Sequence, residues 1–180
     1  MSALGDLLAF QRETEALGQV MGRLGWDQET MMPRGAALQR GEEMAALEGV
    51  LHARRTDPRV GEWLEHATPG TEAEAAQLRL IAHSYTRACR VPGDLAAEIA
   101  RVTSVSQGKW AAARKADDLA GFLPVLGQVI DLRRAEAAAL ADGGDAYDAL
   151  LDGYEPGITG AEIAALFDRM RPGLVDLRAA

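Results

Sequence analysis

The spacing of the apolar residues constrains the fold of this chain more than any other feature of its sequence. Apolar side chains recur at intervals of three and four residues, which places them along one face of a helix with 3.6 residues per turn. The first such stripe, between positions 2 and 24, contains Leu4, Leu7, Leu8, Leu17, Val20, Met21 and Leu24. No stretch shows the sustained alternation of apolar and polar residues that is typical of β-strands. We therefore predict an all-α fold, a multi-helix bundle of about seven helices.

Capping and turn signals predict where these helices begin and end. Asp57 occupies an N-cap position, and Pro58 follows at the first helical position, where its missing N–H costs nothing. Thr71 and Glu74 have the spacing of a capping box, and a second capping box begins at Thr159. The predicted helices cover residues 2–24, 34–54, 57–66, 71 to the residues before Pro92, 94–117, 119–141, 147–151, and a last stretch from 159 that is still apolar at the end of the sequence.

Length and composition favour one domain. A chain of 180 residues with 48% hydrophobic content can bury a sizeable core, and no linker or low-complexity tract interrupts it. We predict a single helical domain over residues 1–180.

The charge of the chain and its cysteine content indicate which partners are disfavoured and which cellular compartment is expected. The formal net charge of −8 disfavours binding to nucleic acid and to anionic lipid surfaces. Cys89 is the only cysteine, which excludes an intramolecular disulfide and favours a reducing compartment. The first residues have no basic region before an apolar core, and no run is long enough to span a membrane. We therefore expect a cytoplasmic protein.

The segment Trp26–Pro33 concentrates unusual side chains at the end of the first predicted helix. Pro33 lacks a backbone N–H and disfavours the helical conformation of the residue before it, so we expect the first helix to stop ahead of this segment. Trp26 and the two methionines provide large apolar groups for a packed corner. The polar residues expected to satisfy backbone donors at the helix end are Asp27, Glu29 and Thr30. We interpret the segment as a structural elbow in preference to a catalytic site.

The same octet, Trp-Asp-Gln-Glu-Thr-Met-Met-Pro, resembles a signature near the start of the carboxypeptidase Taq family of zinc metallocarboxypeptidases. Three further stretches fall in that family's order and approximate spacing: Val91-Pro92, Trp110–Arg114 and Tyr147–Gly157. Met31 departs from the family, which often has an aromatic residue there. The resemblance implies that the chain is the N-terminal helical part of a larger metallopeptidase fold. It also implies zinc in the full-length protein, peptide substrates cleaved at their C-termini, and a homodimer.

The family's zinc motif, His-Glu-x-x-His, is absent from these 180 residues. Glu62 and His66 have the i, i+4 spacing of a helical ligand pair, but no second histidine joins them in sequence. His52 and His83 stand alone in predicted helices. We therefore predict no metal, cofactor or catalytic site residue in this chain, and we leave open whether the chain alone is an enzyme.

Two other groups of residues have side chains that could be reactive. Cys89 lies between Arg87 and Arg90, which would lower a thiol pKa, but a packed helical cysteine is the preferred interpretation. The acids of the octet and of Asp152–Glu155 could form an acid–base pair if they met in space, and capping or turn roles are preferred for both.

Two hypotheses about function remain. The first is the helical region of a metallocarboxypeptidase that is inactive without the rest of its fold. The second is a free-standing helical module that dimerises or binds a protein. If the chain is part of a larger fold, apolar stripes without a partner are expected to be covered, most simply by a two-fold dimer that includes the first or the last helix. A well-behaved monomer without exposed apolar surface would favour the free-standing module.

Overall fold

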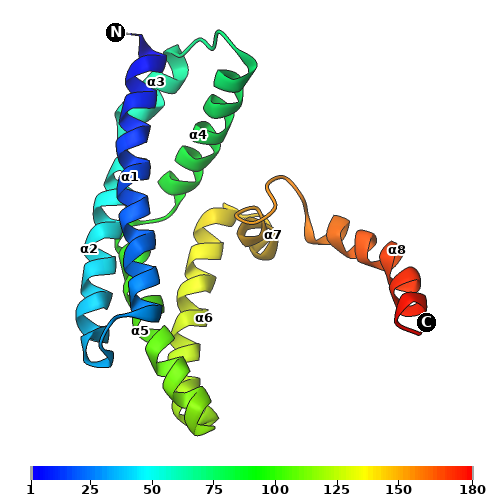
Figure 1. Cartoon of the computed structure of the whole chain (residues 1–180). Helices are drawn as coiled ribbons and strands as arrows, with labels where there is room; N and C mark the ends of the chain where they lie inside the picture. Colours follow the sequence, from blue (N-terminus) through cyan, green and yellow to red (C-terminus); the bar gives the residue numbers. More distant parts are fainter. Residues whose placement is uncertain (1, 180) are drawn as a thin grey trace. The chain divides into compact units, whose positions relative to one another are not determined.

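The computed structural model describes residues 2–179, and all regular structure within that range is helical (Figure 1). The all-α prediction is confirmed. The helices are α1 (Ala3–Thr30), a 3₁₀ turn η1 (Arg34–Ala36), α2 (Ala37–Arg55), α3 (Pro58–His66), α4 (Glu72–Arg90), α5 (Gly93–Ala116), α6 (Leu119–Ala141), α7 (Ala146–Leu151) and α8 (Gly160–Ala179). None of the helices in residues 2–179 is long and apolar enough to cross a bilayer.

Contacts divide the chain into two compact units, Met1–Ala135 and Glu136–Ala180. The single domain expected from the length stays a prediction. In the first unit α2 packs extensively along α5, and α1 packs against α2 and α3 (Figure 1). The fully buried side chains are Leu7 of α1, Leu51 of α2 and Val60 of α3, so the centre of this core lies where these three helices meet. In the second unit α7 contacts α8.

The capping signals read from the sequence are present. The Asp57 side chain accepts a hydrogen bond from the Arg59 N–H at 2.9 Å, and Pro58 is the first residue of α3. Thr71 and Glu74 form a reciprocal capping box at the start of α4. Each bond satisfies a backbone donor that the helix itself leaves without a partner.

Helix α6 covers residues 119–141, as predicted, and contains Pro124 in its interior. The Asp118 carboxylate accepts a hydrogen bond from the Gly121 N–H at 2.9 Å, which stabilises the first turn of this helix. Pro124 follows soon after this turn, where only one helical hydrogen bond is lost, and the helix continues through it.

Close approach of α2 and α5 depends on a glycine. A Cβ atom on Gly41 would lie 2.8 Å from the Cγ2 of Val105 and 3.4 Å from the Arg101 carbonyl oxygen. Gly41 is buried. The absence of a side chain at this position therefore sets how closely the two helices pack.

Candidate functional site

The predicted elbow at Trp26–Pro33 is instead the last part of a helix and an ion-pair site. Helix α1 runs through Thr30, whose hydroxyl donates to the Trp26 carbonyl one turn earlier at 2.7 Å. The expectation that the helix stops near Leu24 was wrong. The packed corner was also wrong, because the side chains of Trp26 and Met31 are 64% and 71% exposed.

Asp27 is held by an arginine from the next helix. Arg40 of α2 is 8% exposed, and its Nη2 donates to the Asp27 carboxylate at 2.5 Å. The same guanidinium donates to the carboxylate of Glu43 at 2.9 Å and to the backbone carbonyl of Leu24. The hydrogen bond to Asp27 raises the pKa of Arg40, with Glu43 acting in the same direction and burial against it. Asp27 therefore acts in an interhelical clamp and does not cap the helix end.

Gln28 connects the same end of α1 to α5. Its side-chain nitrogen donates to the Ser104 carbonyl at 2.8 Å, and the Ser104 hydroxyl donates to the Gln28 side-chain oxygen at 2.6 Å. Ser104 is buried. Consecutive residues of the octet thus bind two different helices, α2 and α5. These contacts support the structural interpretation of the octet over the catalytic one.

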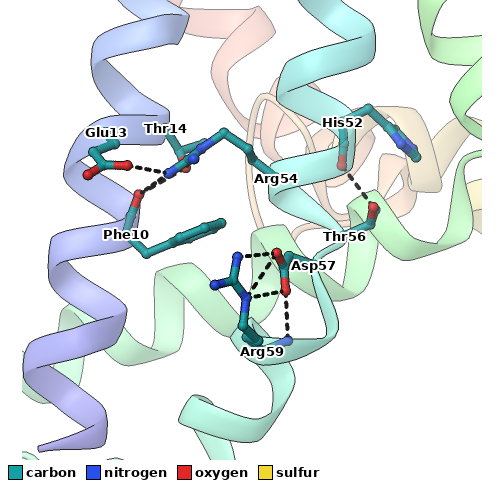
Figure 2. A network of polar contacts seen from close by, with 8 residues as sticks. All are labelled: Phe10, Glu13, Thr14, His52, Arg54, Thr56, Asp57 and Arg59. Carbon is teal, nitrogen blue, oxygen red and sulfur yellow. Dashed lines mark hydrogen bonds and ion pairs between the residues drawn. The ribbon is translucent and has the colours of Figure 1, made fainter.

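A second polar network joins the other end of α1 to α2 (Figure 2). Arg54 donates to the Thr14 hydroxyl and to the Phe10 carbonyl, both at 3.0 Å, and pairs with Glu13 at 3.1 Å. Its guanidinium carbon lies 4.0 Å from the centre of the Phe10 ring, a cation–π contact. One arginine therefore satisfies a carbonyl and a buried hydroxyl, and covers an aromatic ring.

The turn between α2 and α3 continues this network. Arg59 hydrogen-bonds to the Asp57 carboxylate, with the shortest contact at 2.7 Å, and this bond lowers the pKa of Asp57. The Thr56 hydroxyl donates to the His52 carbonyl at 2.8 Å (Figure 2). These bonds hold the chain reversal at residues 56–57.

The three histidines lie on three different helices, α2, α3 and α4. The His52 ring nitrogen Nε2 lies 2.7 Å from the Val91 carbonyl oxygen, so it must donate a hydrogen. The His66 Nδ1 lies 2.7 Å from the backbone carbonyl oxygen of Glu62, so this contact does not involve the Glu62 carboxylate. His83 is on α4 and also has a partner. Over residues 2–179, no three His, Cys, Asp or Glu side chains come together as a metal site would require. The residues present therefore do not fit the catalytic zinc site that the resemblance implies.

Cys89 is exposed on α4, one helical turn after Tyr85. Burial, followed by the neighbouring Cys89 thiol, raises the pKa of the Tyr85 hydroxyl. The preferred interpretation of a packed helical cysteine was wrong about packing, because the side chain is exposed.

The acids near the end of the chain have turn roles. The Asp152 carboxylate accepts from the Gly157 N–H at 3.1 Å, and Asp148 accepts from the Gly160 N–H at 2.7 Å. Gly157 has a φ of +83°, a conformation that side chains other than glycine rarely adopt. The predicted turn role of Asp152 is confirmed.

An open cavity of about 290 Å³ lies where α5 ends and α6 begins. Its lining includes Trp110, Arg114, Leu119 and Phe122, together with the two aspartates of the connecting turn. Trp110 and Arg114 belong to one of the stretches that carried the family resemblance. The cavity is part apolar and part charged, and it contains no histidine.

Sequence reasoning missed Arg40 and Arg54, the two arginines around which the polar networks are built. Both belong to a predicted helix with many charged residues, and the i, i+3 pair of Arg40 with Glu43 does not distinguish it from other charged pairs on helix surfaces. Arg40 reaches Asp27 across 13 positions, and Arg54 reaches Thr14 across 40. Only the packing of α1 against α2 brings these groups together.

Comparison with known proteins gives one consistent result. The sequence profile of the carboxypeptidase Taq (M32) metallopeptidases matches residues 6–180. Thermostable carboxypeptidase 1 of Thermus thermophilus is 41% identical over 98% of this chain, and the match covers 38% of that protein. The solved structure of Pyrococcus furiosus carboxypeptidase is 28% identical with a TM-score of 0.77, over 98% of this chain and 36% of that one. The solved structure of the M32 carboxypeptidase of Deinococcus radiodurans is 28% identical with a TM-score of 0.74, over 97% of this chain and 36% of that one. The chain therefore spans little more than a third of the length of these relatives.

Proposed function

Because the chain belongs to the carboxypeptidase Taq (M32) metallopeptidase family, we propose that it is the helical scaffold region of a carboxypeptidase that removes C-terminal residues from peptides. The observation that carries this proposal is the match of the family profile over residues 6–180. The relatives with this match include proteins named as carboxypeptidases. The metal proposed for the whole protein is zinc, which would supply an activated water.

The scaffold role is supported by the use of the family-like residues within the first unit. Asp27 and Gln28 tie α1 to α2 and α5 through Arg40 and Ser104. Such bonds position helices. Among residues 2–179 no group of three or more His, Cys, Asp or Glu side chains could hold a metal ion. We therefore propose that the 180-residue chain alone is inactive.

An alternative function is a free-standing helical module that dimerises or binds a protein. In this alternative the exposed apolar residues of α6 and α8 would form the interaction surface, because such surfaces often mark interaction sites. A two-fold dimer would cover one of these faces. Location in the cytoplasm is a further proposal, supported by the presence of a single cysteine.

Two measurements test this function. Peptidase activity of the purified chain is assayed on an N-terminally blocked dipeptide with a free carboxylate, with added zinc, and bound metal is measured after dialysis. We expect no turnover and no stoichiometric zinc. Chelator-sensitive turnover by the chain alone would contradict the scaffold role. The second measurement is the coding sequence that follows position 180: a His-Glu-x-x-His motif there supports the carboxypeptidase, and a stop codon supports the free-standing module.

A further inference from the structure

The first half of α6 is apolar on every side. From Leu119 to Ile130 the sequence contains no charged residue, and Gln128 is its only polar side chain. A helix that is apolar all round is normally buried all round. In the first unit, however, only part of this helix is covered.

Two faces of α6 differ in exposure. Phe122, Val125 and Val129 are half-buried. A neighbouring set, which we call the α6 seam, is between 37% and 69% exposed and consists of Leu119, Leu123, Leu126 and Ile130. These four residues are separated by four, three and four positions, the spacing with which one helix packs along another.

The cavity at the start of α6 extends this surface. Leu119 belongs both to the seam and to the cavity lining, and Trp110 of α5 contributes an indole that is 50% exposed. An apolar surface of this kind is costly in water, at about 25 cal/mol per Å². We therefore expect another polypeptide segment to cover this surface.

We propose that the α6 seam docks the polypeptide that corresponds to the rest of the M32 fold, which is the part of the relatives outside the matched region. The match leaves more than half of each relative's length unaccounted for, enough to form a second layer over α6. The second unit has its own exposed apolar residues on α8: Leu166, Phe167, Met170, Leu174, Val175 and Leu177. A two-fold contact through the seam would leave those residues uncovered, whereas one long polypeptide can cover both surfaces. The inference rests on the proposed function.

The test uses the Thermus thermophilus carboxypeptidase with its matched region deleted, coexpressed with this chain. We expect a 1:1 complex, and slower amide hydrogen exchange in residues 119–130 than in the chain alone. Leu123→Asp combined with Ile130→Asp should weaken the complex at least tenfold, because two charges would face an apolar surface. Leu80→Asp is the matched control, since Leu80 is a 66% exposed leucine on α4, and it should leave the complex unchanged.

A second measurement uses this chain alone. We expect it to bind a dye specific for exposed apolar surface, and the double seam variant to bind less than half as much at unchanged helical content by circular dichroism. Three outcomes would overturn the proposal: no association with the Thermus segment, a complex that the seam variant does not weaken, or a stable dimer of this chain that the seam variant dissociates. A seam-dependent complex that shows no zinc-dependent carboxypeptidase activity would instead count against the proposed function and leave the docking surface standing.

Discussion

Gln28 and Ser104 lie 76 positions apart and exchange two hydrogen bonds, one from the glutamine amide to the serine carbonyl and one from the serine hydroxyl back to the amide oxygen. Each residue of the pair thus provides a hydrogen-bond partner for the polar groups of the other. It also joins the C-terminal part of α1 to the middle of α5.

Gln28→Ala should lower the free energy of unfolding by about 1–3 kcal/mol, because the Ser104 hydroxyl and carbonyl both lose a partner in a buried place. Urea denaturation followed by circular dichroism measures the change. Gln77→Ala, at an exposed position of α4, is the control and should change stability by less than about 0.5 kcal/mol. Equal effects of the two substitutions would show that the exchanged bonds carry no stability.

Arg40→Ala should destabilise the protein by about 2–4 kcal/mol, since a buried guanidinium with three acceptors is removed and Asp27 is left without its partner. Arg40→Lys should recover part of this loss, because an ammonium cannot reach all three acceptors with a planar fork. The control is Arg79→Ala, which breaks an exposed pair with Glu72 and should cost less than about 1 kcal/mol. A double-mutant cycle with Asp27→Ala measures the coupling, and a coupling near zero would contradict the clamp.

Gly41→Ala and Gly49→Ala should have opposite signs although both lie on α2. The new methyl group at position 41 would meet Val105 and cost about 1–3 kcal/mol, whereas position 49 faces open space. Gly49→Ala should stabilise by about 0.5–1 kcal/mol through helix propensity. Thermal denaturation compares the two variants, and a stabilising Gly41→Ala would mean that α2 and α5 are not in close contact.

Glu48→Gln should stabilise the protein increasingly as the pH rises. Burial raises the pKa of Glu48 above its ordinary value near 4.5, against the opposing effect of Arg55. The folded protein therefore binds the Glu48 proton more tightly than the unfolded chain does. The contribution of this proton to the free energy of unfolding is fully present below about pH 4.5 and is lost as the pH rises through the folded-state pKa. Glutamine imitates the protonated form at every pH.

Urea denaturation from pH 4 to pH 7 tests this linkage. The stability difference between Glu48→Gln and the parent should grow with pH, and Arg55→Ala should make the parent's own decline steeper because it removes a charge that lowers the Glu48 pKa. A difference that stays constant, or that shrinks with pH, would contradict the assignment of burial as the dominant cause.

Sequence patterns predicted the features that depend on near neighbours. Asp57 caps α3, Thr71 and Glu74 cap α4, and α6 has its predicted bounds, because each signal acts within a few residues. The family resemblance, carried by whole stretches of sequence, was confirmed by the profile match.

The end of α1 could not be predicted in this way. Pro33 restricts only the residue before it, so nothing local required the helix to stop as early as Leu24. The role of Asp27 depends on Arg40, and that of Gln28 on Ser104, partners that only the tertiary fold supplies. Trp26 was expected inside on grounds of size, but it is 64% exposed.

The contact between Phe10 and Trp63, whose ring centres lie 5.5 Å apart with Arg59 nearby, gives the protein a natural optical probe. Trp26 and Trp110 are at least half exposed and should be quenched by iodide, whereas Trp63 is partly shielded by α1. The indole emission that survives quenching would then come mainly from Trp63. The loss of this Trp63 emission during unfolding would report when α1 separates from α3, without an added fluorescent label.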